Sequence, residues 1–208
     1  MEKLQENIKS LSNKTSGTIR IGIIRALSMY LLPELLSSFL NKYPDVNINI
    51  VTGFSAELMK SLANNYVHLV ILREDIEWPY YKKNISSSRI SIFSKTPIDF
   101  FQLPNLPRIN YKTNPSLQTI IEKWWKNNFN TPSNIIMQAD NSETCVELVK
   151  SGLGYAIIPE LSLKESEKLF YYPILNKKKQ PIKRKTWIYC ANEAEDYIAV
   201  QKFLQILD

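Results

Sequence analysis

Histidine, cysteine and glycine are scarce in this 208-residue chain, and each scarcity excludes a class of site. One histidine, His68, and two cysteines, Cys145 and Cys190, cannot assemble a zinc constellation or a disulfide framework. Of the five glycines, Gly152 and Gly154 precede a predicted strand, which is the wrong order for a dinucleotide-binding loop. We therefore expect no metal and no cofactor, and we expect both cysteines to be buried and inert.

Motifs of enzyme active sites are missing as well. The sequence has no G-x-S-x-G nucleophile elbow and no G-x-x-x-x-G-K-[ST] phosphate loop. A Ser-His-Asp or Cys-His arrangement would have to use His68, which begins a predicted buried strand without a Cys or Asp partner nearby. We predict that His68 is structural and that the chain is not an enzyme.

Long apolar runs and an export signal are also absent. Even the apolar stretch 21–40 is interrupted by an arginine, a serine, a proline and a glutamate, which a membrane-spanning helix would not carry together. Residues 1–7 form a charged helical pattern without the apolar core of a signal peptide. These features predict a cytoplasmic protein.

The positive charge is spread along the chain. Lysine and arginine exceed aspartate and glutamate by 26 to 20, and the formal charge of +6 raises the question of a polyanionic partner. The densest basic run, residues 177–185, lies in a predicted loop with no nucleic-acid-binding motif around it. We interpret it as a solvated loop, and a nucleic-acid patch is the alternative.

Composition and patterning indicate a globular α/β protein. Hydrophobic residues make up 44% of the chain and charged residues 22%, as in ordinary globular proteins. In the first half, β-rich segments alternate with segments whose apolar residues recur at helical spacing. Strands are predicted at residues 18–24, 47–51 and 68–72, and helices at 29–42 and 55–64. This alternation predicts a mostly parallel sheet with right-handed crossovers.

A second α/β lobe follows a change of character in the middle of the chain. A strand at 89–93 leaves the first lobe, and the proline-rich stretch 97–115 shows little helical pattern. Trp124 and Trp125 are adjacent in a predicted helix, so we expect one to pack in the core and the other to reach a surface. Further strands are predicted at 134–139, 155–158 and 185–190, and helices at 116–129, 142–151 and 193–207.

Several motifs, in this order and at these spacings, resemble the effector-binding domain of LysR-type transcriptional regulators. They are Gly17-Thr-Ile-Arg-Ile-Gly22, Leu31-Leu-Pro-Glu-Leu-Leu36 with Phe39 and Tyr43-Pro44, Gly53, and Gly152-Leu-Gly-Tyr-Ala-Ile-Ile-Pro159. The resemblance implies two Rossmann-like lobes joined by two crossover strands, as in type 2 periplasmic-binding proteins, with a ligand cleft between the lobes. It implies lobe I at residues 17–92 and 188–208, and lobe II at 93–187.

The same resemblance implies how such a domain works within a regulator. Residues 1–16 would be the remnant of a linker helix, and the winged helix-turn-helix that contacts DNA is absent from this chain. Subunits would pair as homodimers or homotetramers through lobe I and the linker helix. No membrane partner is implied.

A narrower resemblance is to the catabolite control protein C and E group, which senses citrate and governs genes of the tricarboxylic-acid cycle. The residues that carry it are Thr52-Gly-Phe-Ser-Ala-Glu-Leu-Met-Lys-Ser-Leu62, His68-Leu-Val-Ile-Leu-Arg73, Glu77-Trp78, Trp124-Trp125, Glu143-Thr-Cys145 and Arg184-Lys-Thr-Trp187. It implies that the effector is citrate or a related di- or tricarboxylate.

The chemistry of doubly wound sheets also favours an anion. Ligands bind outside the carboxyl ends of the strands, where helix N-termini present free N–H groups and partial positive charge. Arg73 directly follows an apolar predicted strand and offers a guanidinium fork that matches a carboxylate. Its alternative role is an ion pair with Glu74 or Asp75. Arg184 is the second candidate, and its alternative role is one more solvated charge in the basic loop.

Hydroxyl groups at helix starts complete the expected site. Ser28, Ser55 and Ser142 occupy N-cap or first-turn positions, where a hydroxyl either binds a carboxylate or only caps the helix. Arg25 adds charge at the cleft or lies at its rim, and Thr144 is a weaker candidate one turn into its helix. Two guanidinium groups suit a di- or tricarboxylate, because a singly charged ligand would leave one of them uncompensated.

Two other functions stay open from the sequence. One is an effector domain of the same kind for a different small anion. The other is a solute-binding protein of similar bilobal fold, against which the missing export signal weighs.

Overall fold

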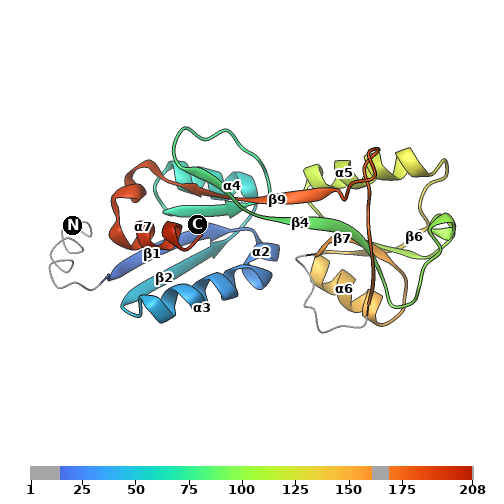
Figure 1. Ribbon diagram of the computed structural model, residues 1–208, viewed down its shortest axis with the longest axis horizontal. Coiled ribbons are helices and arrows are strands. Elements are labelled where there is room, and N and C mark those ends of the chain that lie inside the picture. Colours follow the sequence, from blue (N-terminus) through green and yellow to red (C-terminus); the bar gives the residue numbers. More distant parts are fainter. Residues whose placement is uncertain (1–14, 161–168, 208) are drawn as a thin grey trace. The chain divides into compact units, whose positions relative to one another are not determined.

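The structure, a computed structural model, describes residues 15–160 and 169–207. The chain divides into two compact units, one formed by residues 1–87 and 185–208 and the other by residues 88–184. Two strands, β4 (Lys82–Ser94) and β9 (Lys183–Cys190), begin in one unit and end in the other (Figure 1). Of the expected linker segment 1–16, all but the last two residues lie outside the described part of the chain.

The first unit is built on four strands in the order β2-β1-β3-β9. Strand β1 (Gly17–Ile23) pairs in parallel with both β2 (Val46–Thr52) and β3 (Leu69–Leu72), and β9 runs antiparallel to β3. Every residue of β3 is buried, as expected for a central strand that is covered on both faces. The predicted parallel β-α-β-α-β opening is therefore confirmed.

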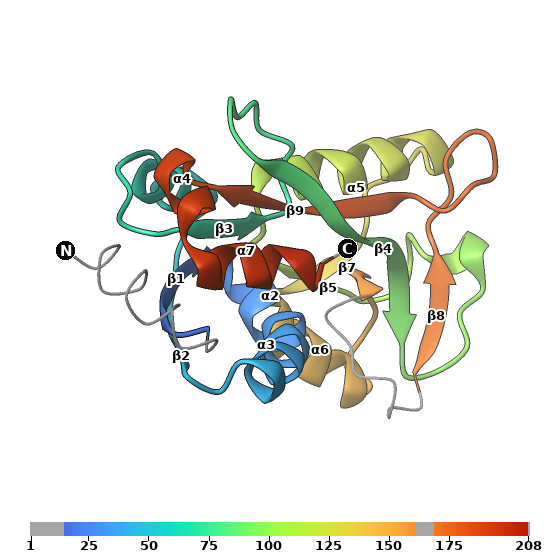
Figure 2. The same cartoon turned by 60° about the vertical axis from the view of Figure 1, so that its left-hand side comes forward.

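Helices cover both faces of this sheet (Figures 1 and 2). On one face, Phe39 of α3 (Leu32–Lys42) meets Phe203 of α7 (Ile198–Gln205) edge-on, with ring centroids 5.2 Å apart. The other face carries α4 (Ser55–Ala63). These helices bury the apolar stripes that the sequence pattern predicted.

Glycine at position 22 allows α4 to lie close to β1. A Cβ atom at Gly22 would come within 3.1 Å of Leu58 Cδ2 in α4 and of Val70 Cγ2 in β3. That distance is shorter than an ordinary carbon–carbon contact, so a larger residue would push the helix away from the sheet.

Two predicted helices differ from the structure. The helix expected at 29–42 is divided at Leu31 into α2 (Arg25–Tyr30) and α3, because Pro33 lies in the first turn of α3 and has no N–H to continue a preceding helix. The helix expected at 193–207 is a 3-10 turn, η3 (Asn192–Asp196), followed by α7.

The second unit repeats the same plan. Strand β5 (Arg108–Tyr111) pairs in parallel with β6 (Ile135–Ala139), and its Ile109 N–H donates to the Tyr155 carbonyl beside β7 at 2.8 Å. Strand β4 runs antiparallel to β7 (Ala156–Pro159) and to β8 (Phe170–Pro173). The helices are α5 (Pro115–Asn128) and α6 (Ser142–Lys150), with a 3-10 turn, η1 (Phe100–Gln102). The predicted α/β class with two Rossmann-like lobes is confirmed.

Two short strands of the second unit, β5 and β8, were not among the predicted elements. Each has four residues, and β5 lies within the proline-rich stretch, where the pattern suggests only a loop. Both become strands because a neighbouring strand pairs with them, β6 in one case and β4 in the other. Pairing across the sheet therefore decides the structure of these segments.

Both of the adjacent tryptophans are buried, which differs from the prediction that one of them reaches a surface. Trp124 and Trp125 have 4% and 6% of their surface exposed. The chain turns back after α5 and covers Trp125, whose ring centroid lies 4.5 Å from that of Phe129. The indole Nε1–H of Trp125 donates to the Thr131 carbonyl at 2.9 Å. This local turn satisfies the buried indole, so neither tryptophan needs solvent.

Residues predicted to be structural are buried. His68 is 3% exposed, its Nδ1 accepts from the Arg20 N–H at 3.3 Å, and its ring stacks on Tyr197 at 5.0 Å. Cys145 and Cys190 are buried free thiols, as predicted. Burial raises the pKa of each thiol to about 12, so both stay protonated at neutral pH.

The lysines of the basic run 177–185 are exposed, in line with a solvated loop, and the strand β9 begins within the run at Lys183. Among the described residues, no helix combines the length and the apolar character that crossing a membrane requires.

Both thiols are expected to be unreactive toward a disulfide reagent in the folded protein at pH 8, because pH 8 lies far below their raised pKa and their sulfur atoms are buried. Titration with Ellman's reagent at pH 8 checks this, and both thiols react once urea unfolds the chain. Rapid modification of either cysteine under native conditions would contradict the burial of that thiol.

Candidate functional site

The carboxyl ends of β1, β2 and β3 meet at one edge of the first unit's sheet. Their register pairs Ile23 with Thr52 and with Ile71, so the three strands end side by side. From this edge the chain continues into α2, into α4 and, after β3, into Arg73. Parallel strands place such ends at the ligand side of doubly wound sheets.

Arg73 is almost completely buried at this edge, with 7% of its surface exposed. Its neighbours along the chain each bind elsewhere. The Glu74 carboxylate accepts from the Ser55 hydroxyl at 2.7 Å, and Asp75 forms a salt bridge with Lys82. A guanidinium group withdrawn from water to this extent requires polar or charged groups around it, which suits a carboxylate ligand.

The hydroxyls of Ser55 and Ser28 do not cap their helices. Ser55 is the first residue of α4, and the N-cap residue, Phe54, provides no side-chain hydrogen bond to the helix. Ser28 donates within α2 to the carbonyl of Arg25 at 2.7 Å, and Arg25 itself is exposed. The structure therefore joins Ser55 to Glu74, the residue that follows Arg73, and it places Ser28 and Arg25 on α2 after β1.

Arg184 belongs to the second unit and is not a solvated charge of the basic run. It is 7% exposed, and its Nη2 donates to Asn114 Oδ1 and to Ser116 Oγ, both at 2.9 Å. Asn114 is the N-cap of α5 and accepts from the Leu117 N–H at 3.1 Å. Arg184 thus ties the start of β9 to the start of α5.

Ser142 and Thr144 lie at the N-terminus of α6. The N-cap is Asn141, whose side chain accepts from the Thr144 N–H at 2.8 Å, so the capping role falls to a residue outside the expected set. Ser142 is 6% exposed, whereas the Thr144 side chain is exposed. The first turn of α6 therefore presents a hydroxyl and backbone N–H groups near the end of β6.

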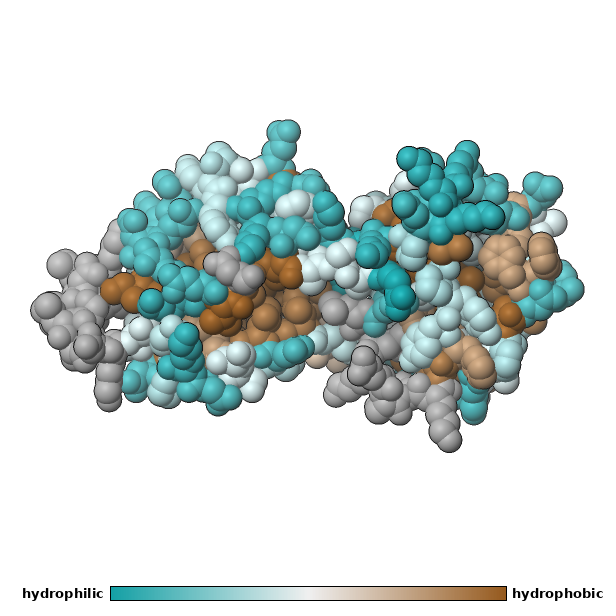
Figure 3. Space-filling view, viewed as in Figure 1, coloured by the Kyte–Doolittle hydropathy of each residue, from teal (hydrophilic) through white to brown (hydrophobic). Residues whose placement is uncertain are grey.

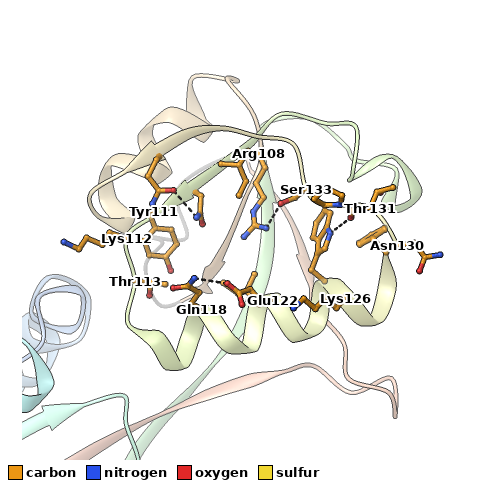
Figure 4. A pocket seen from close by; sticks show the side chains of 17 residues that line it. Arg108, Tyr111, Lys112, Thr113, Gln118, Glu122, Lys126, Asn130, Thr131 and Ser133 are labelled. Carbon is orange, nitrogen blue, oxygen red and sulfur yellow. Dashed lines mark hydrogen bonds between the residues drawn. The ribbon is translucent and has the colours of Figure 1, made fainter.

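A pocket of about 620 Å³ in the second unit contains none of the seven predicted site residues. It lies between α5 and the strands β5 and β6, and Arg108 of β5 projects into it (Figure 4). Sequence reasoning missed Arg108 because β5 was not predicted. A basic residue within the proline-rich stretch was the only available signal, and it does not distinguish a loop from a strand.

Replacement of Arg184 by alanine is expected to lower the free energy of unfolding by about 1–3 kcal/mol, because Asn114 and Ser116 lose a buried charge-assisted donor. Urea denaturation measures the change. The matched control is Lys183→Ala, which removes an exposed charge from the adjacent position and is expected to have little effect. Equal effects of the two substitutions would show that the Arg184 contacts contribute nothing to stability.

Comparison with known proteins gives a consistent family match. The chain matches the family described as LysR substrate binding domain over residues 12–208. It is 37% identical over 207 residues to the uncharacterized HTH-type transcriptional regulator YraN of Bacillus subtilis (strain 168), covering 100% of this chain and 72% of that protein. It is 30% identical over 208 residues to the regulator YkuM of the same organism, covering 99% and 71%. These relatives are named as transcriptional regulators and not as enzymes, which confirms the prediction that the chain is not an enzyme.

Solved structures show the same fold at low sequence identity. The BenM effector binding domain with its effector benzoate has a TM-score of 0.69 at 17% identity, covering 91% of this chain and 90% of that one. The effector binding domain of QuiR in complex with shikimate has a TM-score of 0.67 at 16% identity, covering 92% and 95%. The cofactor-binding domain of the Cbl transcriptional regulator has a TM-score of 0.67 at 19% identity, covering 93% and 94%.

Proposed function

The chain belongs to the LysR substrate-binding domain family, and we propose that the effector it senses is citrate or a related di- or tricarboxylate. The observation that carries the proposal is the buried guanidinium group of Arg73 at the carboxyl end of β3. Ligands of doubly wound sheets bind at this end of the strands, and a guanidinium group there matches a carboxylate with two parallel hydrogen bonds.

Groups around Arg73 support a carboxylate ligand. The N-terminus of α4 has no side-chain cap, so its first N–H groups are available to an anion. The Ser55 hydroxyl donates to Glu74 and can accept from a hydroxyl group of the ligand, and Arg25 adds a second positive charge at the start of α2. Ser28 has used its proton within α2 and can only accept, which suits a hydroxyl group of the ligand.

In the second unit, Ser142, Thr144 and Arg184 are the residues for which we propose contacts with a carboxylate group. Ser142 and Thr144 lie in the first turn of α6, and Arg184 holds a buried guanidinium group at the start of α5. A helix N-terminus and a guanidinium group each match the chemistry of a carboxylate.

The known ligands of similar domains support the chemical class. Benzoate in BenM and shikimate in QuiR are both carboxylates, although each carries a single one. The choice of citrate rests on the narrower sequence resemblance. We propose that the ligand controls transcription of central-metabolism genes in the cytoplasm, through DNA contacts made by a part of the regulator outside the described residues.

Two other functions are alternatives to citrate sensing. The first is an effector domain for a different small anion, which would use the same donors, so only ligand titration distinguishes it from a citrate sensor. A solute-binding protein of similar fold is disfavoured, because the relatives YraN and YkuM are named as transcriptional regulators.

Isothermal titration with citrate, isocitrate, succinate and acetate tests the ligand. We expect citrate or isocitrate to bind, and we expect Arg73→Gln to weaken binding by about 10- to 100-fold, the value of a charge-assisted pair of hydrogen bonds. The matched control is Arg89→Gln, since Arg89 is half exposed on β4 and pairs with Glu160. Folded protein that binds none of the four acids would exclude the carboxylate proposal, and equal binding by Arg73→Gln would remove Arg73 from the site.

We also propose that subunits pair through the first unit. Strand β2 ends the order of its sheet, and its Ile50 and Val51 are each 47% exposed. Apolar surface is also visible on this unit around α3 and α7 (Figure 3). An exposed sheet edge with apolar side chains is a surface that a second copy can cover.

Ile50→Lys is expected to shift the protein from dimer toward monomer, because a lysine on the edge of β2 would have to be desolvated in the interface. Sedimentation velocity over a concentration series measures the shift, with Asn192→Lys, which adds the same charge at an exposed position in η3, as the control. A monomeric parent protein, or an Ile50→Lys variant that dimerises normally, would contradict pairing through this edge.

A further inference from the structure

We propose that the second unit has a ligand site of its own, in the pocket between α5 and the strands β5 and β6, and that it binds a small planar monoanion of the aryl carboxylate class. This site is separate from the one proposed around Arg73 and does not depend on it. Both walls and the buried charge come from residues of the second unit alone.

Arg108 is the feature that calls for a ligand. It is 7% exposed, and its Nη1 donates to Ser133 Oγ at 3.0 Å. Its Nε is buried and makes no hydrogen bond to any described residue. Within residues 15–160 and 169–207, no carboxylate lies at ion-pair distance from this guanidinium group. A buried cation without a counter-charge among these residues is costly, and an anion in the pocket that Arg108 lines offsets this cost.

The Arg108 side chain is aimed into the pocket. Figure 4 shows its guanidinium group pointing into the middle of the pocket, toward α5. Nη1 donates to Ser133 and Nε is buried, so Nη2 is the nitrogen that we expect to donate to a carboxylate oxygen. Burial also lowers the pKa of Arg108, which reflects the same loss of solvation.

Aromatic side chains define the shape of the ligand. The Arg108 guanidinium carbon lies 5.6 Å from the ring centroid of Trp125, and Phe129 lies against Trp125 at 4.5 Å. Ile121 of α5 adds an apolar wall. A carboxylate joined to a flat aromatic body places its charge on Arg108 and its ring along these walls, and about 620 Å³ accommodates such a molecule.

The charges around the pocket favour an anion. Arg108, Lys112 and Lys126 line it together with one carboxylate, Glu122, whose Oε1 accepts from Gln118 at 2.8 Å. Of the three cations only Arg108 is buried, and one carboxylate group is enough to pair with it. A ligand with one carboxylate group and an apolar body therefore suits this pocket better than a tricarboxylate, which separates this site from the proposed citrate site.

The probe is 2-naphthoate, and the control is 2-naphthamide, which is uncharged and has a similar shape. Calorimetric titration measures the affinity for both compounds. We expect 2-naphthamide to bind at least about 10-fold more weakly than 2-naphthoate, since only the acid pairs with Arg108. The substitution Arg108→Gln is expected to lower the affinity for 2-naphthoate by about 10- to 100-fold. The Trp125 indole N–H signal, assigned in the NMR spectrum with Trp125→Phe, is expected to shift on binding.

A second variant keeps the test decisive if Arg108→Gln fails to fold. Glu122 is exposed, so the substitution Glu122→Gln leaves the core intact. Because it removes a negative charge from the pocket lining, we expect the affinity for 2-naphthoate to rise about 3-fold. Lys123→Gln, an exposed charge change on α5 outside the pocket lining, is the control and is expected to have little effect. Weaker binding in Glu122→Gln, or equal affinity for the acid and the amide, would overturn the proposal.

Arg73→Gln separates this proposal from that of a citrate site. The variant is expected to lose citrate binding and to keep 2-naphthoate binding unchanged. Loss of 2-naphthoate binding in Arg73→Gln, or absence of 2-naphthoate binding in the parent protein, would exclude the pocket as a site of this class whatever the outcome with citrate.

Discussion

The burial of β3 on both faces is the constraint on which the first unit depends. Its four apolar residues, Leu69–Leu72, lie between β1 and β9, with helices above and below the sheet. Because all four are covered, the chain cannot turn until the strand ends, and the first polar side chain after it, Arg73, emerges at the edge where β1 and β2 also end. The burial of β3 thus determines both how the core packs and where the candidate ligand site lies.

Three buried arginines illustrate how local partners decide what a guanidinium group does. Arg184 is satisfied by Asn114 and Ser116, so its first role is to join two elements of the second unit. The Arg108 side chain makes one hydrogen bond to the described residues and lies over the face of Trp125, which leaves its Nε unused. Arg73 directly follows β3, and its neighbour Glu74 accepts from the Ser55 hydroxyl. The groups around each buried guanidinium group distinguish a structural role from a binding role.

The two units share one plan and differ in the chemistry that they offer. In each, parallel strands end beside helix starts and an antiparallel strand passes on to the other unit. The first unit presents Arg73 and the uncapped start of α4, which suit a carboxylate group. The second adds a pocket with aromatic walls, where Arg108 is the buried cation. The two units therefore offer different surroundings to an anion.

The sequence by itself determined the fold class, the order of most strands and helices and the position of Arg73 at a strand end, because these depend on hydrophobic periodicity along the chain. It also indicated the family, through motifs that the comparison with YraN and YkuM supports. Only the tertiary structure decided that 108–111 is a strand, that Trp125 is covered, and that Arg184 binds Asn114 and Ser116. These features arise from contacts between residues far apart in the chain, or from a turn that folds back on a helix, and no local pattern encodes the partner that satisfies a buried polar group.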